Sequence, residues 1–289
     1  MLNIYGPGGI GGLIAGVLAK NGQKVAVVAT NQTAKIINEQ GITIDSKKFG
    51  KFTVEVPALT SPQRGSEILV TTKSYALPAI EKSIRSARPK ELCALFNGFD
   101  HARHIHSLNE AESWSGAAYG ISERVSPGVI HHTSNFFKVE LPDMAMDGEI
   151  SRVLLNGGID VFFRGTEQQV LWRKLRNQCA MALLTTATGR PIGRALDQSP
   201  KLAQALCKEL AHIATLENVP TRPAEIYSFL TKLPPDSTSS LARDAHEGNR
   251  TELHALGSAV LEEACRLGVP TPALSAAVAA AEENIRGRR

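Results

Sequence analysis

The chain has 289 residues, of which 43% are hydrophobic and 21% charged, enough to build two globular domains. It carries 32 basic and 28 acidic residues, and the formal net charge of +4 is too small and too dispersed to favour a nucleic-acid partner. Four scattered cysteines without C-x-x-C spacing predict buried thiols and a cytoplasmic location. No apolar run approaches about 18 residues, so we expect neither a membrane span nor a signal peptide.

Strands and helices alternate through the first part of the chain. A short strand at residues 2–5 is followed by a segment whose apolar residues recur at helical spacing. Further strands are predicted at residues 24–29, 68–71, 92–96 and 116–121, with helices at residues 33–40 and 76–87. This alternation predicts a parallel sheet with helices on both faces, that is, a Rossmann-type doubly wound domain.

The pattern becomes helical near residue 165. Residues 157–165 carry the last strand signal, and a long helix is predicted from Thr166 onward. Further helices are expected at residues 201–219 and 251–267, with a stop at Gly268 and a new start at Pro272. We therefore predict an α/β dinucleotide-binding domain at residues 1–165 and an all-α substrate domain at residues 166–289.

Residues 6–12, between the first predicted strand and its helix, contain five glycines and a proline. Gly6, Gly8 and Gly11 have the spacing G-x-G-x-x-G: the first permits a tight turn, the second lets the backbone approach a pyrophosphate, and the third lets helix and strand pack closely. The start of the helix, at Gly9 and Ile10, supplies free N–H groups for the anion. We predict that these five residues bind a dinucleotide.

The end of the second predicted strand bears on the type of dinucleotide. Sites for NAD commonly place an acid there, on the ribose 2′-hydroxyl, whereas this chain has Thr30, Asn31 and Gln32, with Lys35 one turn later. Thr, Asn and Lys can donate to a 2′-phosphate, which a carboxylate would repel. The stretch favours NADP over NAD, with Thr30 as a cofactor contact.

Polar residues that could carry a reaction follow strands or lie on the long helix. Lys174 is one turn from Asn177 and Gln178, so all three can face an interdomain cleft, although such a face can also be a solvated helix surface. A lysine in a cleft can protonate a ketone oxygen as hydride arrives. Lys73 and Asn97 follow predicted strands, at the sheet edge where ligands bind, or are simple turn residues.

Histidines form two further groups. His101, His104 and His106 have a spacing that matches no closed metal site, and we predict no metal. The pair His131 and His132 ends a predicted strand and is interpreted as a polar edge. A serine-hydrolase elbow, G-x-S-x-G, does not occur in the sequence, which argues against acyl transfer.

Several motifs together resemble the ketopantoate reductase family, NADPH-dependent enzymes that reduce 2-dehydropantoate to pantoate on the way to pantothenate and coenzyme A. In chain order they are GPGGIG at the start, TTKS after the third predicted strand, FNG at Asn97, GAAYGISERVSPGVIH at residues 116–131, WRKL at Lys174, SSLARD from Ser239 and RTEL around Glu252. The resemblance covers nearly the whole chain, and it depends on the order and spacing of the motifs.

The resemblance implies a role for each matching position. Lys73 and Asn97 would line the nicotinamide side of the cleft, with Asn97 also near the substrate. Lys174 would be the general acid, and Ser240, otherwise interpretable as part of a helix cap, would bind the substrate carboxylate. Glu252 would orient the lysine or the substrate hydroxyl.

Two departures from the family pattern concern the substrate. Gln178 stands where the family usually has Asn, with Asn177 one place earlier, and Ala182 stands where a second Asn is common. In the family both positions hydrogen-bond the pantoyl group, and an unpaired substrate hydroxyl costs about 1 to 3 kcal/mol. The usual Arg after the second strand is also absent. We take Asn177 and Gln178 as substrate-binding candidates and keep a less polar 2-oxo acid beside ketopantoate.

A hypothesis from another class is a non-catalytic NADP-binding sensor that uses the helical domain for partner contact. The presence of Lys174, Asn97, Ser240 and Glu252 argues against it, since a sensor needs no acid in a cleft. We expect a small-molecule 2-oxo acid as partner, no nucleic acid and no membrane, and either a monomer or a homodimer.

Overall fold

The computed structural model describes residues 1–109 and 112–287. Its chain divides into two compact units. The first contains Met1–Phe96 and His101–Val170, and the second contains Asn97–Asp100 and the residues from Leu171 onward. The short segment Asn97–Asp100 thus belongs to the second unit, although the residues on both sides of it belong to the first.

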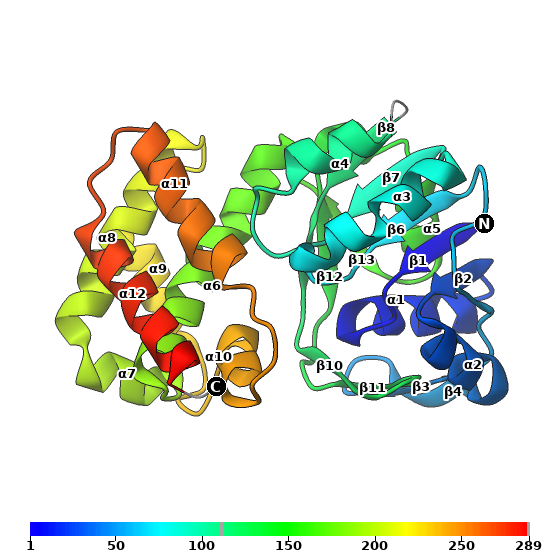
Figure 1. Cartoon of the computed structure of the whole chain (residues 1–289), viewed down its shortest axis with the longest axis horizontal. Coiled ribbons are helices and arrows are strands. Elements are labelled where there is room, and N and C mark those ends of the chain that lie inside the picture. The colour runs from blue at the N-terminus through cyan, green and yellow to red at the C-terminus, as the bar shows by residue number, and fades with distance from the viewer. Residues whose placement is uncertain (110–111, 288–289) are drawn as a thin grey trace. The chain divides into compact units, whose positions relative to one another are not determined.

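A six-stranded sheet forms the centre of the first unit, in the order β5-β2-β1-β6-β7-β8 (Figure 1). Every neighbouring pair in it is parallel, which confirms the predicted Rossmann-type sheet. The strands are β1 (Leu2–Tyr5), β2 (Val25–Val28), β5 (Ala58–Leu59), β6 (Glu67–Val70), β7 (Glu91–Ala94) and β8 (Glu112–Ser115). The buried runs of β1 and β2 explain their central place, because a parallel strand is covered on both faces.

Helices cover both faces of this sheet. Leu69 and Cys93 point to the face that packs against α1 and α5, whereas Ile68 and Leu92 point to the face that packs against α3 and α4. The helices of the unit are α1 (Gly9–Lys20), α2 (Asn31–Gln40), the 3-10 turn η1 (Ser74–Ala76), α3 (Leu77–Ala87), α4 (Ala102–Leu108), the 3-10 turn η2 (Asp143–Ala145) and α5 (Glu149–Asn156).

Two smaller sheets complete the first unit, and most of their strands were not predicted. One has the order β10-β11-β3-β4 and packs on α1, and the other has the order β13-β12-β9. Their strands are β3 (Ile42–Ser46), β4 (Gly50–Val54), β9 (Ala117–Tyr119), β10 (Ser122–Ser126), β11 (Val129–His132), β12 (Lys138–Leu141) and β13 (Asp160–Phe163).

The strand predicted at residues 116–121 is shorter, and it lies outside the parallel sheet. It is β9, which pairs antiparallel with β12. The chain leaves the parallel sheet after Ser115, at Gly116, where a Cβ atom would lie 2.8 Å from the carbonyl oxygen of Glu140. This close approach of two backbones needs a glycine, which the sequence alone does not distinguish from a glycine inside a strand.

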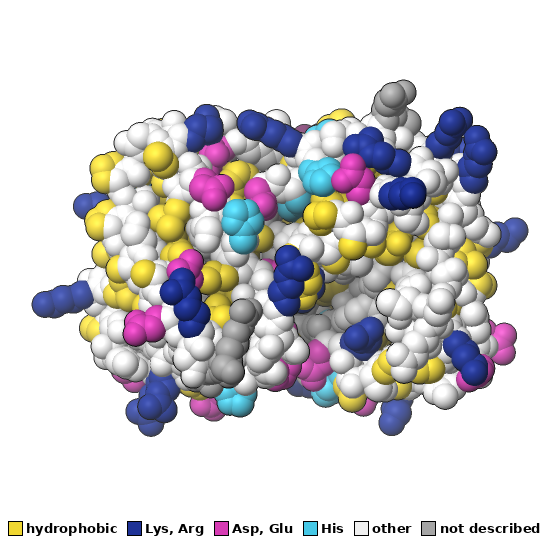
Figure 2. Space-filling model, viewed as in Figure 1, with side chains coloured by type: hydrophobic (Ala, Val, Ile, Leu, Met, Phe, Trp, Pro, Cys, Tyr) yellow, Lys and Arg dark blue, Asp and Glu magenta, His cyan; other side chains and the backbone are white. Residues whose placement is uncertain are grey.

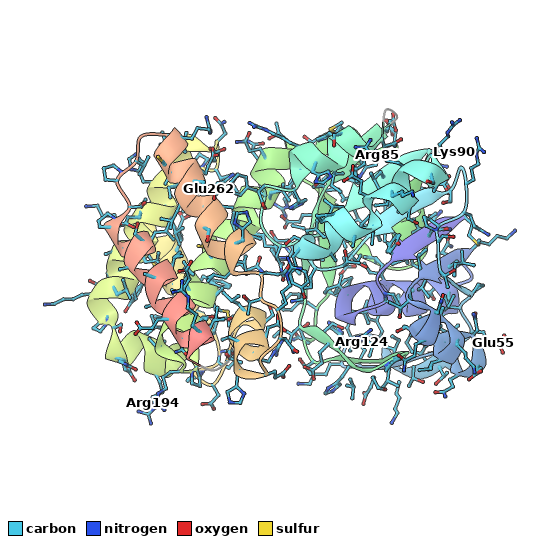
Figure 3. The ribbon with its side chains drawn as sticks, in the orientation of Figure 1. Glu55, Arg85, Lys90, Arg124, Arg194 and Glu262 are labelled. Atoms are coloured by element: carbon cyan, nitrogen blue, oxygen red, sulfur yellow. The ribbon has the colours of Figure 1, made fainter. Side chains whose placement is uncertain are left out.

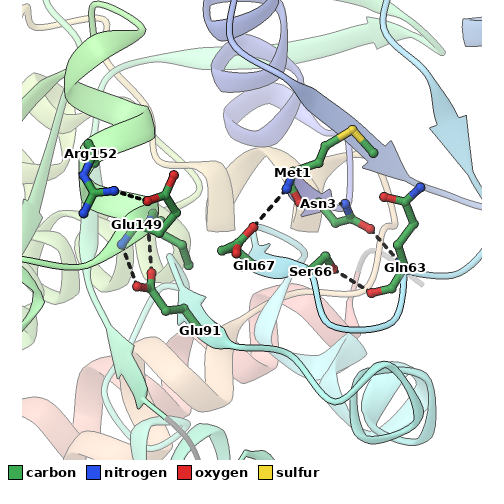
Figure 4. Close-up of polar contacts among 9 residues, drawn as sticks. Met1, Asn3, Gln63, Ser66, Glu67, Glu91, Glu149 and Arg152 are labelled. Carbon is green, nitrogen blue, oxygen red and sulfur yellow. Dashed lines mark hydrogen bonds and ion pairs between the residues drawn. The ribbon is translucent and has the colours of Figure 1, made fainter.

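Carboxylates at the amino ends of β6 and β7 have structural partners (Figure 4). Glu67 accepts from the amino group of Met1 over 3.1 Å, and Glu91 accepts from the backbone N–H groups of Glu149 and Ile150 over 2.5 and 2.8 Å. Glu91 thereby caps α5. These acids stabilise the edge of the sheet opposite to the one on which a ligand is expected.

The second unit is all-helical in its described residues, as predicted. Its core gathers large side chains such as Trp172, Leu183 and Leu210. Charged side chains such as Arg194 and Glu262 point outward (Figure 3). The helices are α6 (Glu167–Thr188), whose first turn lies in the first unit, α7 (Ile192–Gln198), α8 (Pro200–Leu216), α9 (Pro223–Lys232), α10 (Ser240–His246), a π-helix (His254–Ser258), α11 (Ala259–Arg266) and α12 (Pro272–Arg286).

The beginnings of two helices in this unit are unusual. The helix predicted at residues 251–267 begins with the π-helix, and regular α-helix follows only from Ala259. Thr271 stands at the N-cap of α12 but its side chain makes no capping bond. Instead Glu209 of α8 accepts from the N–H groups of Ala273 and Leu274 over 2.9 and 2.7 Å, so a distant carboxylate caps the helix.

The surface shows no gathered basic patch on the face seen in Figure 2, where Lys and Arg side chains are spread out. None of the helices in the described part of the chain is both long enough and apolar enough to cross a membrane.

Candidate active site

The glycine loop lies at the carboxyl end of β1, between β2 and β6, where the strand order of the sheet reverses. Gly6 has φ +88°, and a Cβ on it would collide with Thr72. A Cβ on Gly11 would collide with the hydroxyl of Thr71, which donates to the carbonyl oxygens of Tyr5 and Gly6 over 3.0 and 2.9 Å. The first and third glycines are therefore fixed by packing within the unit.

Gly8 differs from these two glycines. It is the N-cap of α1, and beyond its neighbours in the chain no described atom lies within 4 Å of the Cβ that it would carry. An α-helix leaves its first N–H groups without intrahelical partners, here those of Gly9, Ile10 and Gly11, and the first turn contains no acid. Open space, free amides and the positive end of the helix dipole fit a pyrophosphate group. The buried hydroxyl of nearby Thr72 has no hydrogen-bond partner among the described residues.

The end of β2 leads directly into α2. Thr30 is exposed at the N-cap of α2, its hydroxyl donates to that of Thr33 over 3.2 Å, and the first turn contains no acid. Lys35 is exposed and forms a 3.9 Å ion pair with Glu39. The start of α2 therefore offers hydroxyl and amide groups, and its first turn contains no carboxylate. Such a surface is compatible with a 2′-phosphate.

Three of the predicted residues meet in the second unit. The ammonium group of Lys174, on α6, donates to Oδ1 of Asn97 over 2.9 Å. Nδ2 of the same amide donates to Oε2 of Glu252, also over 2.9 Å. Only one orientation of the amide satisfies both neighbours, because the reverse would place NH₂ against the ammonium group and oxygen against the carboxylate. Asn97 thus joins an acid and a cation in a defined order.

Burial strengthens this arrangement. The Glu252 residue is only 3% exposed, and Lys174 and Asn97 are half-buried. Charge-assisted hydrogen bonds are shorter and stronger than neutral ones, and a partly water-free setting strengthens them further. The arrangement can hold an ammonium donor in a fixed direction, which is what a general acid requires.

The other candidates on α6 lie beyond Lys174. Asn177 and Gln178 are half-buried, and the Oε1 atom of Gln178 is buried without a hydrogen-bond partner in the part of the chain that the structure describes. Ala182 is fully buried in the helical core. Of the two positions at which the family usually has Asn, position 178 thus carries a polar side chain and position 182 an apolar one.

Ser240 and Lys73 occupy the beginnings of helical turns. Ser240 is the first residue of α10, and the cap itself is Ser239, whose hydroxyl accepts from the N–H of Ala242 over 3.0 Å and shares a 2.8 Å hydrogen bond with Thr185. The half-buried Ser240 hydroxyl is therefore not the capping group. Lys73 directly precedes η1.

The histidines of α4 have carboxylate partners. Nε2 of His104 lies 3.0 Å from Glu81, and Nε2 of His106 lies 2.8 Å from Glu167. In the part of the chain that the structure describes, no group of three or more His, Cys, Asp or Glu residues could hold a metal ion.

Comparison with known proteins then decides the family. Residues 3–145 match the sequence profile of "Ketopantoate reductase PanE/ApbA", and residues 167–284 match that of its C-terminal domain. The chain belongs to the ketopantoate reductase family. The predicted resemblance is confirmed, and the chain is an oxidoreductase of a family that uses a nicotinamide cofactor.

Relatives within this family are distant. The chain is 25% identical over 294 residues to the uncharacterized oxidoreductase YkpB of Bacillus subtilis, with 94% of each chain covered. It is 23% identical over 286 residues to the 2-dehydropantoate 2-reductase of Caulobacter vibrioides, with 96% of each covered.

Solved structures share the whole fold. A PanE/ApbA family ketopantoate reductase from Ralstonia eutropha superposes with a TM-score of 0.89 at 24% identity, covering 100% of this chain and 99% of the other. D-mandelate dehydrogenase, in a complex with NADH and anilino(oxo)acetate, superposes with a TM-score of 0.87 at 18% identity, again covering 100% and 99%. These likenesses confirm a Rossmann-like domain followed by an all-helical domain.

Two groups of residues near the candidate site residues were not singled out from the sequence of this ketopantoate reductase family member. Thr71 and Thr72 pack against the glycine loop, and the only signal was their place in the TTKS motif. Phe99 and Asp100 follow Asn97 and contact Trp172 and His254. Nothing in the sequence pattern indicated these contacts.

Proposed function

We propose that this chain reduces a 2-oxo acid to the corresponding 2-hydroxy acid with NADPH, and that ketopantoate is the first substrate to test. The observation that carries the proposal is the hydrogen-bonded series Lys174, Asn97, Glu252 in a member of an oxidoreductase family. A buried acid, an amide and a half-buried ammonium group in this order suit proton delivery to a carbonyl oxygen.

The protein's own groups would act as follows. NADPH, when bound, supplies the hydride for the carbonyl carbon. Lys174 would donate a proton from Nζ to the oxygen of that carbonyl group and regain one from solvent afterwards. Asn97 would hold the direction of the ammonium group, and Glu252 would fix the amide. Positioned general acids contribute roughly 10² to 10⁴ in rate.

Preference for NADPH is supported by the start of α2. Thr30 at the N-cap and the first turn without acids leave nothing there to repel a 2′-phosphate. The related D-mandelate dehydrogenase was solved with NADH, so both cofactors belong in the test.

A second candidate is a reductase for a less polar 2-oxo acid. Ala182 is fully buried in the helical core, and this position cannot offer a hydrogen bond to a substrate hydroxyl. D-mandelate dehydrogenase, whose fold is similar, was solved with anilino(oxo)acetate, which suggests 2-oxo acids other than ketopantoate for the panel.

The test follows the absorbance of the reduced cofactor with purified protein, ketopantoate and a panel of less polar 2-oxo acids, with NADPH and NADH in parallel. Turnover of ketopantoate with NADPH supports the proposal, and preferred turnover of another acid supports the second candidate. Thermal stabilisation by NADPH without oxidation by any 2-oxo acid would overturn both and favour a non-catalytic NADP-binding sensor.

A further inference from the structure

The 97–100 segment, Asn97–Asp100, is held on the helical unit by more than the amide of Asn97. Each of its other three residues makes its own contact there: Gly98 with Ala255, Phe99 with Trp172 and Asp100 with His254. All four residues of the segment therefore contact the helical unit.

The anchors lie beside the partners of Asn97. The rings of Phe99 and Trp172 have centroids 4.9 Å apart, and Trp172 is fully buried close to Lys174 on α6. Oδ2 of Asp100 lies 3.4 Å from Nε2 of His254, the first residue of the π-helix that follows Glu252. The segment therefore connects the helix that carries the ammonium group with the π-helix that begins two residues after the carboxylate of Glu252.

Gly98 sets the distance between the segment and the π-helix. Its φ is +87°, and a Cβ on it would lie 2.9 Å from both Cβ and the carbonyl oxygen of Ala255. Both the conformation and the contact require glycine. π-Helical turns are rare and occur frequently at functional sites, and this one presents Ala255 to the segment.

The anchors differ in strength. Asp100 and His254 are 35% and 63% exposed, and ion pairs of this kind contribute little. Phe99 is half-buried against a fully buried ring, and its contact adds both apolar burial and ring geometry. Phe99 is accordingly the main anchor, and Gly98 makes the close approach possible.

We propose that Phe99, with Gly98, is a positioning residue that keeps the amide of Asn97 between Lys174 and Glu252. This inference rests on the proposed function in one respect, that Lys174 is the acid of the reaction. Displacement by about 1 Å can cost roughly 100-fold in rate, so loss of the anchor would lower proton delivery without touching the glycine loop.

The first test needs no turnover. Acetic anhydride labelling of Lys174 in the cofactor-free protein, followed by mass spectrometry across a pH series, reports the environment of the ammonium group. In Phe99→Ala we expect the pH profile of Lys174 labelling to differ from that of the wild type. In Phe99→Tyr we expect a profile like that of the wild type. Phe229→Ala is the matched control, because Phe229 is also a half-buried ring packed on the helical core.

The second test uses the reductase activity. Phe99→Ala should lower kcat about tenfold or more and shift its pH profile, with an unchanged Kd for NADPH. If Phe99→Ala does not fold, Phe99→Leu serves in its place with an intermediate effect. The inference is overturned if labelling and pH profile match the wild type, or if Phe229→Ala changes them equally. Absence of activity in the wild type would refute the proposed function alone, and the labelling would still decide the positioning.

Discussion

Asn97 and Glu252 are 155 residues apart in the chain, yet Nδ2 of the amide lies 2.9 Å from Oε2 of the carboxylate. Because the other end of the amide accepts from Lys174, the amide links the carboxylate to the ammonium group. In the proposed function each of the three side chains has a different task, and the tasks can be tested one at a time.

Replacement of Lys174 by Ala should reduce kcat by roughly 10² to 10⁴, since a positioned proton donor is removed. The Kd for NADPH should stay within about twofold of the wild type, because the glycine loop lies in the other unit. Steady-state kinetics and a fluorescence titration of NADPH measure the two quantities. Lys174→Arg is the control that keeps the charge and replaces the donor, and a kcat unchanged in Lys174→Ala would exclude the acid role.

Replacement of Gly8 by Ala should separate folding from cofactor binding. Beyond its neighbours in the chain, the added methyl group would meet no described atom within 4 Å, so the melting temperature should be unchanged. It would occupy the space expected for the pyrophosphate, and the Kd for NADPH should rise about tenfold or more, about 1.4 kcal/mol. Calorimetric titration measures the Kd for NADPH, and thermal melts measure the melting temperature.

Gly11→Ala provides the contrast to that variant, because its methyl group collides with Thr71 and the carbonyl oxygen of Gly6. It should lower the melting temperature as well as the affinity. Equal NADPH affinity in Gly8→Ala and wild type would place the pyrophosphate elsewhere.

Replacement of Glu209 by Ala should destabilise the protein by about 1 to 2 kcal/mol, because two N–H groups at the start of α12 lose their acceptor. Urea unfolding followed by circular dichroism measures the loss. Glu262→Ala, at an exposed position of α11, should change stability by less than about 0.5 kcal/mol. If both variants lost the same stability, the cap would not be the cause.

Glu217 predicts a dependence of stability on pH. Burial, followed by the neighbouring Glu263 carboxylate, raises the pKa of Glu217 from 4.5 to about 7, against the opposing effect of Arg266. Between these two pH values the folded state keeps a proton that the unfolded state has lost, so the stability contributed by this group is present below pH 4.5 and lost as pH rises through about 7.

The variant Glu217→Gln cannot ionise and should escape this loss. Above pH 7 it should be more stable than the wild type by roughly 1 to 3 kcal/mol, with the difference vanishing below pH 4.5. Urea unfolding across this range checks the prediction, with Glu262→Gln as the exposed control. A difference that does not vary with pH would contradict the assignment to Glu217.

The parts of the fold that follow from local sequence were predicted well. The buried runs of β1 and β2 and the glycine loop between β1 and α1 identify themselves by composition and spacing. β4 was missed although Phe52 and Val54 alternate with polar residues along it. β10 was missed because most of its side chains are exposed and Val125 is its one apolar residue, which leaves no apolar alternation to detect. Strands of this kind are defined by their partners rather than by their own residues.

Long-range partners also explain the errors at single residues. His132 was interpreted as a polar edge, which is wrong: it is fully buried, with hydrogen bonds of 2.8 Å to Ser46 and to Ser134. For Lys174, the spacing within the helix left a cleft-facing lysine and a solvated helix surface as alternatives, and the family motifs favoured the first. Its contact with Asn97 depends on the tertiary fold, which spacing within one helix cannot reveal.

The assignment of Asn97–Asp100 to the helical unit has a consequence for engineering. A chimaera that exchanges the C-terminal halves of two family members at one junction near residue 165 would pair a foreign lysine and glutamate with the resident asparagine loop. Exchange of the half together with residues 97–100 would transplant the complete hydrogen-bonded assembly of Lys174, Asn97 and Glu252. Evolution faces the same constraint, so substitutions in this short loop should follow those in the distant helices.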